Sequence, residues 1–187
     1  MSNSELKYVN DVFDKNWIAP VGPHISKFEE ILSKKHNNYS VAALNSGTSA
    51  IHLSLILLGV KSGDDVLCSS FTFAATANPI KYLGANPIFI DSEYETWNMC
   101  PELLEKAIKE RIEIGKKPKA IVLVHLYGMP AKVDEILDIS KKFDIPVIED
   151  AAEALGSTYK NKNIGTFGEF GVFSFNGNKI ITTSGGG

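Results

Sequence analysis

The sequence has little of what membrane insertion, secretion or zinc binding would require. Only two cysteines occur, Cys68 and Cys100, with no CxxC spacing and no neighbouring pair of histidines. We therefore expect reduced thiols and no metal site. No apolar run approaches the ~20 residues that span a bilayer; the stretch at 51–60 is interrupted by His52 and Ser54. Residues 1–15 lack the features of an export signal, which predicts a cytoplasmic protein without a membrane partner.

Positive charge is also in short supply. The chain has 19 Lys and Arg against 22 Asp and Glu, a net charge of −3, and no basic block long enough to grip a nucleic-acid backbone. It has no Gly-Lys-Ser/Thr triphosphate loop, and its GxxGxxG at 165–171 precedes a predicted strand instead of opening a helix, which excludes a dinucleotide fold. What is present is an ordinary globular composition, with 187 residues, 44% hydrophobic and 22% charged.

The spacing of apolar residues predicts alternating helices and strands. Helices are expected over 5–15, 25–36, 48–58, 74–82, 101–114 and 133–142. Strands are expected over 41–44, 65–68, 87–90, 120–124, 146–148 and 172–175. The strands are short and apolar on both sides, which is typical of a mostly parallel sheet covered by helices on both faces. The predicted fold is an α/β three-layer sandwich.

In such sheets ligands bind beyond the carboxyl ends of the strands, so the loops that follow the strands are candidate sites. In the loop at 45–50, Gly47 and Thr48 open a helix whose free N–H groups and dipole favour a phosphate. Simple capping of that helix by Ser46 or Thr48 is the alternative. In the loop at 69–73, we expect Phe71 in the core and Phe73 on the cavity floor, against a flat ring.

Two further loops carry charged residues. Glu149 and Asp150 follow a buried strand, and because successive strand residues face opposite ways, only one of them is expected to be functional. No histidine is near them in the sequence, which disfavours a carboxylate metal site. Lys179 lies among apolar residues, five positions after Ser174. A lone lysine is usually a solvated charge, whereas a partly desolvated lysine can react with a carbonyl.

Taken together, these loops resemble those of a known family. The chain is similar to the nucleotide-sugar aminotransferases of the DegT/DnrJ/StrS group in the segments NSGTSA, SFTFAATANPI, VHLYGMPAKVDEI, VIEDAAEALGS and FSFNGNKIITTSGGG. The likeness runs from Gly22 and Pro23 to the terminal glycines. The group consists of pyridoxal 5'-phosphate (PLP) enzymes with the aspartate-aminotransferase fold, known as fold type I. The loop at 175–187 is most similar to enzymes that aminate a UDP-4-keto-6-deoxy-N-acetylglucosamine.

The resemblance implies a role for each candidate residue. Lys179 matches the lysine that holds the cofactor covalently and then moves a proton between substrate and cofactor. Asp150 matches the acid that faces the pyridine nitrogen and keeps it protonated, which makes the ring an electron sink. Glu153 matches a Gln or Glu close to the phenolic oxygen. The remaining matches are to the phosphate contacts and the stacking aromatic, and they are Gly47, Thr48, Ser174 and Phe73.

Lys179 also bears on the reaction, because family members that remove a hydroxyl carry His at this position. The resemblance thus implies amino transfer, with glutamate as the expected donor and a nucleotide-linked 4-keto-6-deoxy sugar as acceptor. A sugar dehydratase and a non-catalytic PLP-binding regulator are the alternatives. His125 and Tyr127 receive no role beyond lining the cavity, and a structural role is equally open.

The resemblance further implies a homodimer with its sites at the subunit interface. The chain ends on Gly185 to Gly187, directly after a site loop and without a closing helix. We therefore expect residues 1–187 to hold an N-terminal arm and a large PLP-binding domain, in a truncated chain that lacks the small carboxyl-terminal domain of the family.

Overall fold

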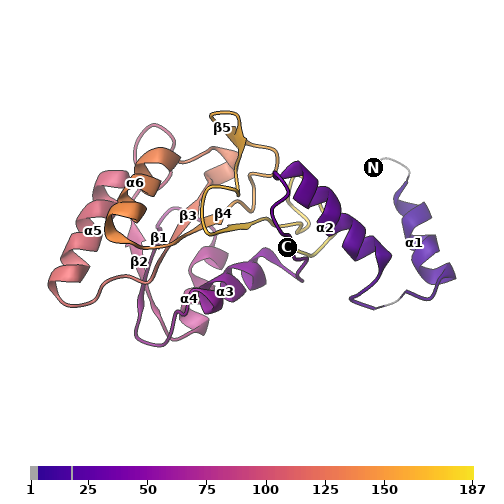
Figure 1. Cartoon of the computed structure of the whole chain (residues 1–187), viewed down its shortest axis with the longest axis horizontal. Coiled ribbons are helices and arrows are strands. Elements are labelled where there is room, and N and C mark those ends of the chain that lie inside the picture. Colours follow the sequence, from indigo (N-terminus) through magenta and orange to yellow (C-terminus); the bar gives the residue numbers. More distant parts are fainter. Residues whose placement is uncertain (1–3, 18) are drawn as a thin grey trace. The chain divides into compact units, whose positions relative to one another are not determined.

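The computed structural model describes residues 4–17 and 19–187. It divides into two compact units, residues 1–43 and 44–187. The first unit holds helices α1 (Glu5–Asp14) and α2 (Pro23–Lys35), as predicted (Figure 1). Pro23 opens α2, where a residue without an N–H is well tolerated. His24 Nε2 lies 2.8 Å from Asp11 Oδ2 and links the two helices.

The second unit is built on a five-stranded sheet in the order β2-β1-β3-β4-β7, in which every pairing is parallel. Its strands are β1 (Asp65–Ser69), β2 (Asn86–Ile90), β3 (Ala120–Val124), β4 (Val147–Asp150) and β7 (Phe170–Val172). Because the strands are parallel, the loops at their carboxyl ends all emerge at one edge of the sheet. The site is expected at this edge.

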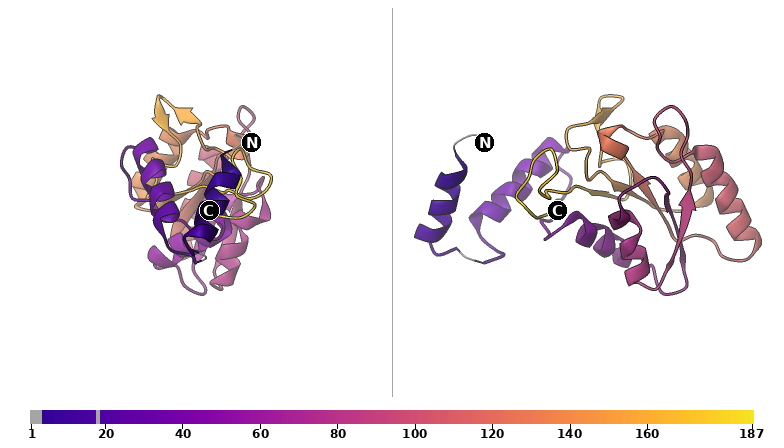
Figure 2. Two further views of the ribbon diagram at one scale, coloured as in Figure 1. Left: turned by 90° about the vertical axis from the view of Figure 1, so that its right-hand side faces the viewer. Right: turned by 180° about the vertical axis from the view of Figure 1, so that it is seen from behind.

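Helices cover both faces of the sheet, which confirms the three-layer sandwich (Figures 1 and 2). They are α3 (Gly47–Leu57) and α4 (Asn78–Tyr82) on one face, and α5 (Pro101–Glu113) and α6 (Val133–Phe143) on the other. Strand β1 shows why both faces are apolar, because Val66 and Cys68 pack toward α3 and α4 while Leu67 packs toward α5 and α6. None of the described helices has the length and apolar character that a bilayer crossing requires.

Three predicted elements differ from the structure. The helix expected over 74–82 is split into a 3₁₀ turn, η1 (Ala74–Thr76), and α4, because Pro79 has no N–H to donate to the preceding turn. The strand expected over 172–175 ends instead at Val172, since its partner β4 ends at Asp150. Residues 41–44 form no strand in the described part of the chain, and Leu44 instead exchanges two backbone hydrogen bonds with Gly187.

Other short elements were not predicted. Strands β5 (Thr158–Tyr159) and β6 (Lys162–Asn163) form an antiparallel hairpin. Its turn residues, Lys160 and Asn161, both have positive φ, the conformation that a two-residue hairpin turn requires. A second 3₁₀ turn, η2 (Leu126–Gly128), follows β3.

Gly171 allows β7 to lie against the loop that carries Gly165. A Cβ at Gly171 would lie 2.0 Å from the carbonyl oxygen of Gly165, whereas a Cβ at Gly177 would meet nothing within 4 Å. We expect Gly171→Ala to lower the free energy of unfolding by about 3 kcal/mol through overpacking, and the control Gly177→Ala to change it by less than about 0.5 kcal/mol. Denaturant unfolding of the full chain measures both, and equal effects would contradict the close approach.

Candidate active site

A cavity of about 570 Å³ opens at the carboxyl ends of the strands. The loops after β1, β3, β4 and β7 line it together with the start of α3. The structure brings to this cavity all of the site residues selected from the sequence, namely Gly47, Thr48, Phe73, Asp150, Glu153, Ser174 and Lys179. Residues from 47 to 179 therefore meet at one place, as the parallel topology predicts.

The N-terminus of α3 forms one end of the cavity. Ser46 is the N-cap, and its Oγ accepts a hydrogen bond from the Ser49 N–H at 3.1 Å. The N–H groups of Gly47 and Thr48 begin the helix, where no preceding turn supplies a carbonyl. A Cβ at Gly47 would lie 3.1 Å from Ser174 Cβ, so glycine lets the Ser174 side chain approach the helix end. The structure shows the capping interpretation, with Ser46 as the cap. The phosphate contact stays a prediction, for which the N–H groups of Gly47 and Thr48 and the Thr48 hydroxyl are available in the cavity.

Asp150 ends β4, is buried, and lines the cavity. Its Oδ2 accepts a hydrogen bond from the Thr76 hydroxyl at 2.6 Å, and its Oδ1 accepts one from the Ala152 N–H at 3.3 Å. Burial raises the pKa of this carboxyl above its usual value, while the Thr76 hydroxyl, the Ala152 N–H and the charge of Lys179 act in the opposite direction. The remaining lone pairs can accept an N–H from a cationic ring.

Glu149 is the neighbour of Asp150 on β4, so its side chain leaves the opposite face of the strand, and it does not line the cavity. It accepts hydrogen bonds from His125 Nε2 at 3.1 Å and from three backbone N–H groups; these belong to Gly165, Phe167 and Gly168. Burial opposes ionisation of Glu149, but these donors outweigh it and hold the pKa of the carboxyl below its usual value. Only one acid of the pair faces the cavity, as predicted.

His125 does not line the cavity, so of the two roles left open for it the structure supports the structural one. Its side chain is fully buried, and its Nδ1 accepts a hydrogen bond from the Ala131 N–H at 3.1 Å. Because Nδ1 is an acceptor, the proton resides on Nε2, which donates to Glu149. Sequence analysis found no histidine near Glu149 because 24 positions separate His125 from Glu149 along the chain. The parallel pairing of β3 and β4 brings them together.

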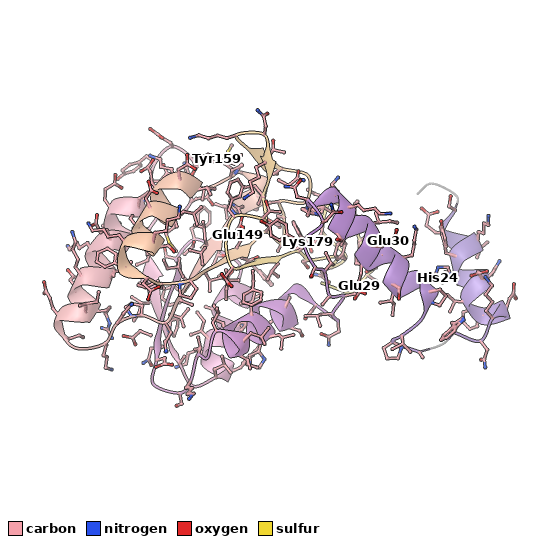
Figure 3. The ribbon with its side chains drawn as sticks, viewed as in Figure 1. His24, Glu29, Glu30, Glu149, Tyr159 and Lys179 are labelled. Carbon is pink, nitrogen blue, oxygen red and sulfur yellow. The ribbon has the colours of Figure 1, made fainter. Side chains whose placement is uncertain are left out.

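Lys179 lies in the loop after β7 (Figure 3). Its side chain is only 11% exposed. It is therefore not the solvated charge that a lone lysine usually is. Its Nζ donates a hydrogen bond to Glu153 Oε1 at 3.0 Å. The amine is thus held inside the cavity, where it can meet a carbonyl group.

Aromatic side chains surround the mouth of the cavity. Phe73 lines it but is 78% exposed, so it lies at the rim and not on the floor. Phe71, expected in the core, also lines the cavity, is partly exposed, and its ring lies 5.9 Å from that of Trp97. Tyr127 lines the cavity as well. The prediction for Phe71 fails because this residue lies in an exposed part of the loop after β1, where Ser70 and Phe73 are exposed as well.

The donor set matches the chemistry of PLP group by group. The start of α3 with Ser174 suits a phosphate, Asp150 suits a protonated pyridine nitrogen, and Lys179 suits an aldehyde carbon. Among the described residues, no group of three His, Cys, Asp or Glu is placed to hold a metal ion. Both cysteines are free. The fold and the site together define a large domain of the fold type I PLP-dependent enzymes.

The chain belongs to the DegT/DnrJ/EryC1/StrS aminotransferase family, whose sequence profile matches residues 1–187. It is 58% identical over 187 residues to the putative pyridoxal phosphate-dependent aminotransferase EpsN of Bacillus subtilis, covering all of this chain and 48% of that protein. It is 43% identical to the GDP-perosamine synthase of Escherichia coli O157:H7, covering all of this chain and 50% of the relative. The chain spans about half the length of these curated relatives.

Solved structures of the family have the same fold. A DegT DnrJ EryC1 StrS aminotransferase from Brucella abortus has a TM-score of 0.94 and 34% identity, over 98% of this chain and 50% of that chain. The PMP form of the putative sugar aminotransferase Spr1654 from Streptococcus pneumoniae has a TM-score of 0.91 and 33% identity, over 100% of this chain and 49% of that chain. The E. coli GDP-4-keto-6-deoxy-D-mannose-3-dehydratase with bound hydrated PLP has a TM-score of 0.89 and 29% identity, over 100% of this chain and 48% of that chain. PLP is the cofactor of this family.

Proposed function

We propose that the whole protein is a PLP-dependent aminotransferase that moves an amino group from L-glutamate to a nucleotide-linked 4-keto-6-deoxy sugar. The observation that carries the proposal is the shielded amine of Lys179, held by Glu153 in the same cavity as Asp150 and the start of α3. The proposal concerns the full chain, because these residues span about half of the related proteins.

Bound PLP supplies an electron sink for the charge that develops when an amino acid loses its α-proton. Asp150 would keep the pyridine nitrogen of the cofactor protonated, through a lone pair that Thr76 and Ala152 leave free. With the cofactor bound, Lys179 Nζ would be the group in the cavity that holds and moves the substrate's α-proton, as general base and then as general acid. Gly47, Thr48 and Ser174 would hold the phosphate of the cofactor at the start of α3.

The sugar substrate is supported by the names of related proteins. Relatives include GDP-perosamine synthases, and one structural neighbour is named for a GDP-linked 4-keto-6-deoxy sugar. The similarity of the loop at 175–187 to the enzymes of the UDP-linked N-acetyl sugar favours UDP instead. The shared chemistry is a 4-keto-6-deoxy sugar on a nucleoside diphosphate, and the nucleotide is left to the experiment below.

A dehydratase is the second candidate, because a dehydratase shares the fold at 29% identity. Lys179 favours transamination over this alternative, since it supplies the amine that returns the proton to carbon. A non-catalytic regulator would need neither Lys179 nor Asp150 in the cavity.

We further propose a cytoplasmic homodimer, as the resemblance implies, in which a second copy covers the exposed aromatic side chains of Phe71 and Phe73 at the cavity mouth.

The donor half of the reaction gives a direct test. We expect L-glutamate alone to convert the absorbance of the PLP-loaded full chain from the aldehyde to the amine form, with no sugar present. Initial rates with both substrates should give parallel double-reciprocal lines, the mark of a ping-pong exchange. If glutamate left the absorbance spectrum unchanged, the proposed transfer of an amino group from glutamate would be contradicted.

The acceptor half identifies the sugar. UDP-, GDP- and TDP-linked 4-keto-6-deoxy sugars are each added to the amine form, with 2-oxoglutarate as the control acceptor. Return of the aldehyde spectrum with one nucleotide sugar supports the proposal and names the nucleotide. Return with simple keto acids and with none of the sugars would exclude the sugar substrate and leave the aminotransferase.

A further inference from the structure

Two threonines of the loop after β1 connect the cavity to Asp150. Thr76 is completely buried at the end of η1, and its Oγ1 lies 2.6 Å from Asp150 Oδ2. The same hydroxyl lies 2.7 Å from Oγ1 of Thr72. Thr72 lines the cavity. The three side chains therefore form a continuous row of hydrogen bonds from the cavity wall to the carboxylate.

The direction of this row follows from the number of protons. An ionised carboxylate only accepts hydrogen bonds, so Thr76 gives its single hydroxyl proton to Asp150. The proton between the two threonines must then come from Thr72. The order of donation is Thr72 to Thr76 to Asp150, and it leaves Thr72 with lone pairs but no free proton toward the cavity.

The row also fixes the orientation of the carboxylate. One oxygen of Asp150 is held by Thr76 and the other by the Ala152 N–H, so rotation of the carboxyl group breaks at least one bond. Hydrogen bonds to an ionised acceptor are roughly twice as strong as neutral ones. The break before Pro79 matters here, because it sets Thr76 in a separate 3₁₀ turn that packs against the end of β4.

Electrostatics points the same way. Burial raises the pKa of Asp150, which favours the neutral acid, and the neutral acid is a poor partner for a protonated ring nitrogen. The Thr76 hydroxyl opposes this effect as the foremost of the groups that lower the pKa. Without Thr76, only the Ala152 N–H and the charges of Lys179 and His125 would remain among these groups to oppose the effect of burial.

We propose that Thr76, supported by Thr72, is a positioning residue that keeps the Asp150 carboxylate ionised and aimed into the cavity. The proposal rests on the proposed function for its catalytic consequence, because only a PLP enzyme needs this carboxylate opposite a ring nitrogen. Its structural part, the directed row of hydroxyls, holds with or without the cofactor.

The first experiment uses the cofactor-free full chain. Thr76→Val keeps the shape of the side chain and removes the hydroxyl, whereas Thr76→Ser keeps the hydroxyl. Without the hydroxyl, the folded-state pKa of Asp150 rises further above its unfolded value of about 3.9. Stability is then lost as the pH rises through that range. We expect the Tm deficit of Thr76→Val relative to Thr76→Ser to be larger at pH 8 than at pH 4, by about 3 °C.

Controls assign this pH dependence to Asp150. Lys179 and His125 are titratable groups whose charges lower the pKa of Asp150, and both are unchanged in the two variants. In an Asp150→Asn background the difference between pH 4 and pH 8 should disappear, and Thr72→Val should give a smaller deficit of the same sign. A Val-to-Ser difference that is equal at both pH values, or that survives Asp150→Asn, overturns the proposal.

The second experiment uses the PLP-loaded full chain. We expect Thr76→Val to lower kcat for the glutamate half-reaction about tenfold, with KM changed less, and to shift the pH titration of the cofactor absorbance. Thr76→Ser should stay within about twofold of the parent in kcat. If the cofactor-free result holds and the loaded enzyme is unaffected, the row of hydroxyls stands, but its catalytic role and the placement of Asp150 at the ring nitrogen fail. If glutamate produces no spectral change in the parent, the proposed function fails independently of the cofactor-free result.

Discussion

Lys179→Ala is expected to abolish turnover of the full chain, with a loss of roughly 10³-fold or more, because the proposed function assigns both the covalent attachment and the proton transfer to this one side chain. Within residues 4–17 and 19–187, Lys179 is the one lysine that lines the cavity, so no neighbouring lysine of this part of the chain can replace it. The fold should survive, because Glu153 is 32% exposed and water can solvate it once its partner is gone. Rate measurements with glutamate and circular dichroism test the two halves of this prediction.

The attachment site can be read directly. Borohydride reduction of the PLP-loaded full chain followed by peptide mapping should place a phosphopyridoxyl group on Lys179. Lys160 is the matched control, because it is exposed and pairs with Asp134 away from the cavity, and Lys160→Ala should leave the rate unchanged. Label on Lys160 or Lys162 would contradict the assignment of Lys179.

Asp150→Asn is the second large effect. An amide cannot hold a proton on the pyridine nitrogen, so we expect cofactor to be retained in part while proton abstraction slows severely. Single-turnover absorbance with glutamate measures that step. A loss below about tenfold, or ~1.4 kcal/mol of barrier, would mean that the carboxylate does not face the ring nitrogen.

Glu149→Gln provides the matched comparison, because the two acids are neighbours on opposite faces of β4. Here the chemistry should change little, whereas the structure predicts a stability loss of about 3 kcal/mol or more, since a buried carboxylate with four donors is replaced. The pKa of Glu149 is lowered in the fold, so its contribution is present above the unfolded value of about 4.3 and is lost as the pH falls through the folded value. The two proteins should therefore converge in stability in acid.

The sequence predicted those parts of the molecule that depend on local pattern. Apolar runs located β1, β3 and β4, and the change of residue type after each strand located the loops of the cavity. Strand alternation correctly separated Glu149 from Asp150. The resemblance supplied the roles, which geometry alone would have left as an anion site, an acid and an amine.

Contacts between residues that are far apart in the sequence could not be predicted from local pattern. Thr76 and Asp150 are 74 positions apart, and His125 and Glu149 are 24 apart, so neither pair has a spacing that marks it. The only sequence signal for the threonine row is two hydroxyls four positions apart in a strand-end loop, which is also an ordinary loop composition. The 41–44 segment failed because an apolar run predicts a strand only if a neighbouring strand is available to pair with it.

The close approach of Gly47 to Ser174 has a consequence for how the protein matures. The two residues are far apart along the chain, and together they form the proposed phosphate site at the start of α3. This site is complete only after the intervening parallel strands have paired. Such nonlocal pairing is slow. Partly folded chains therefore lack a complete phosphate site, and the coenzyme would bind only the native fold. By mass action, a cell rich in the vitamin-derived coenzyme would hold more of the newly made chain in its native state.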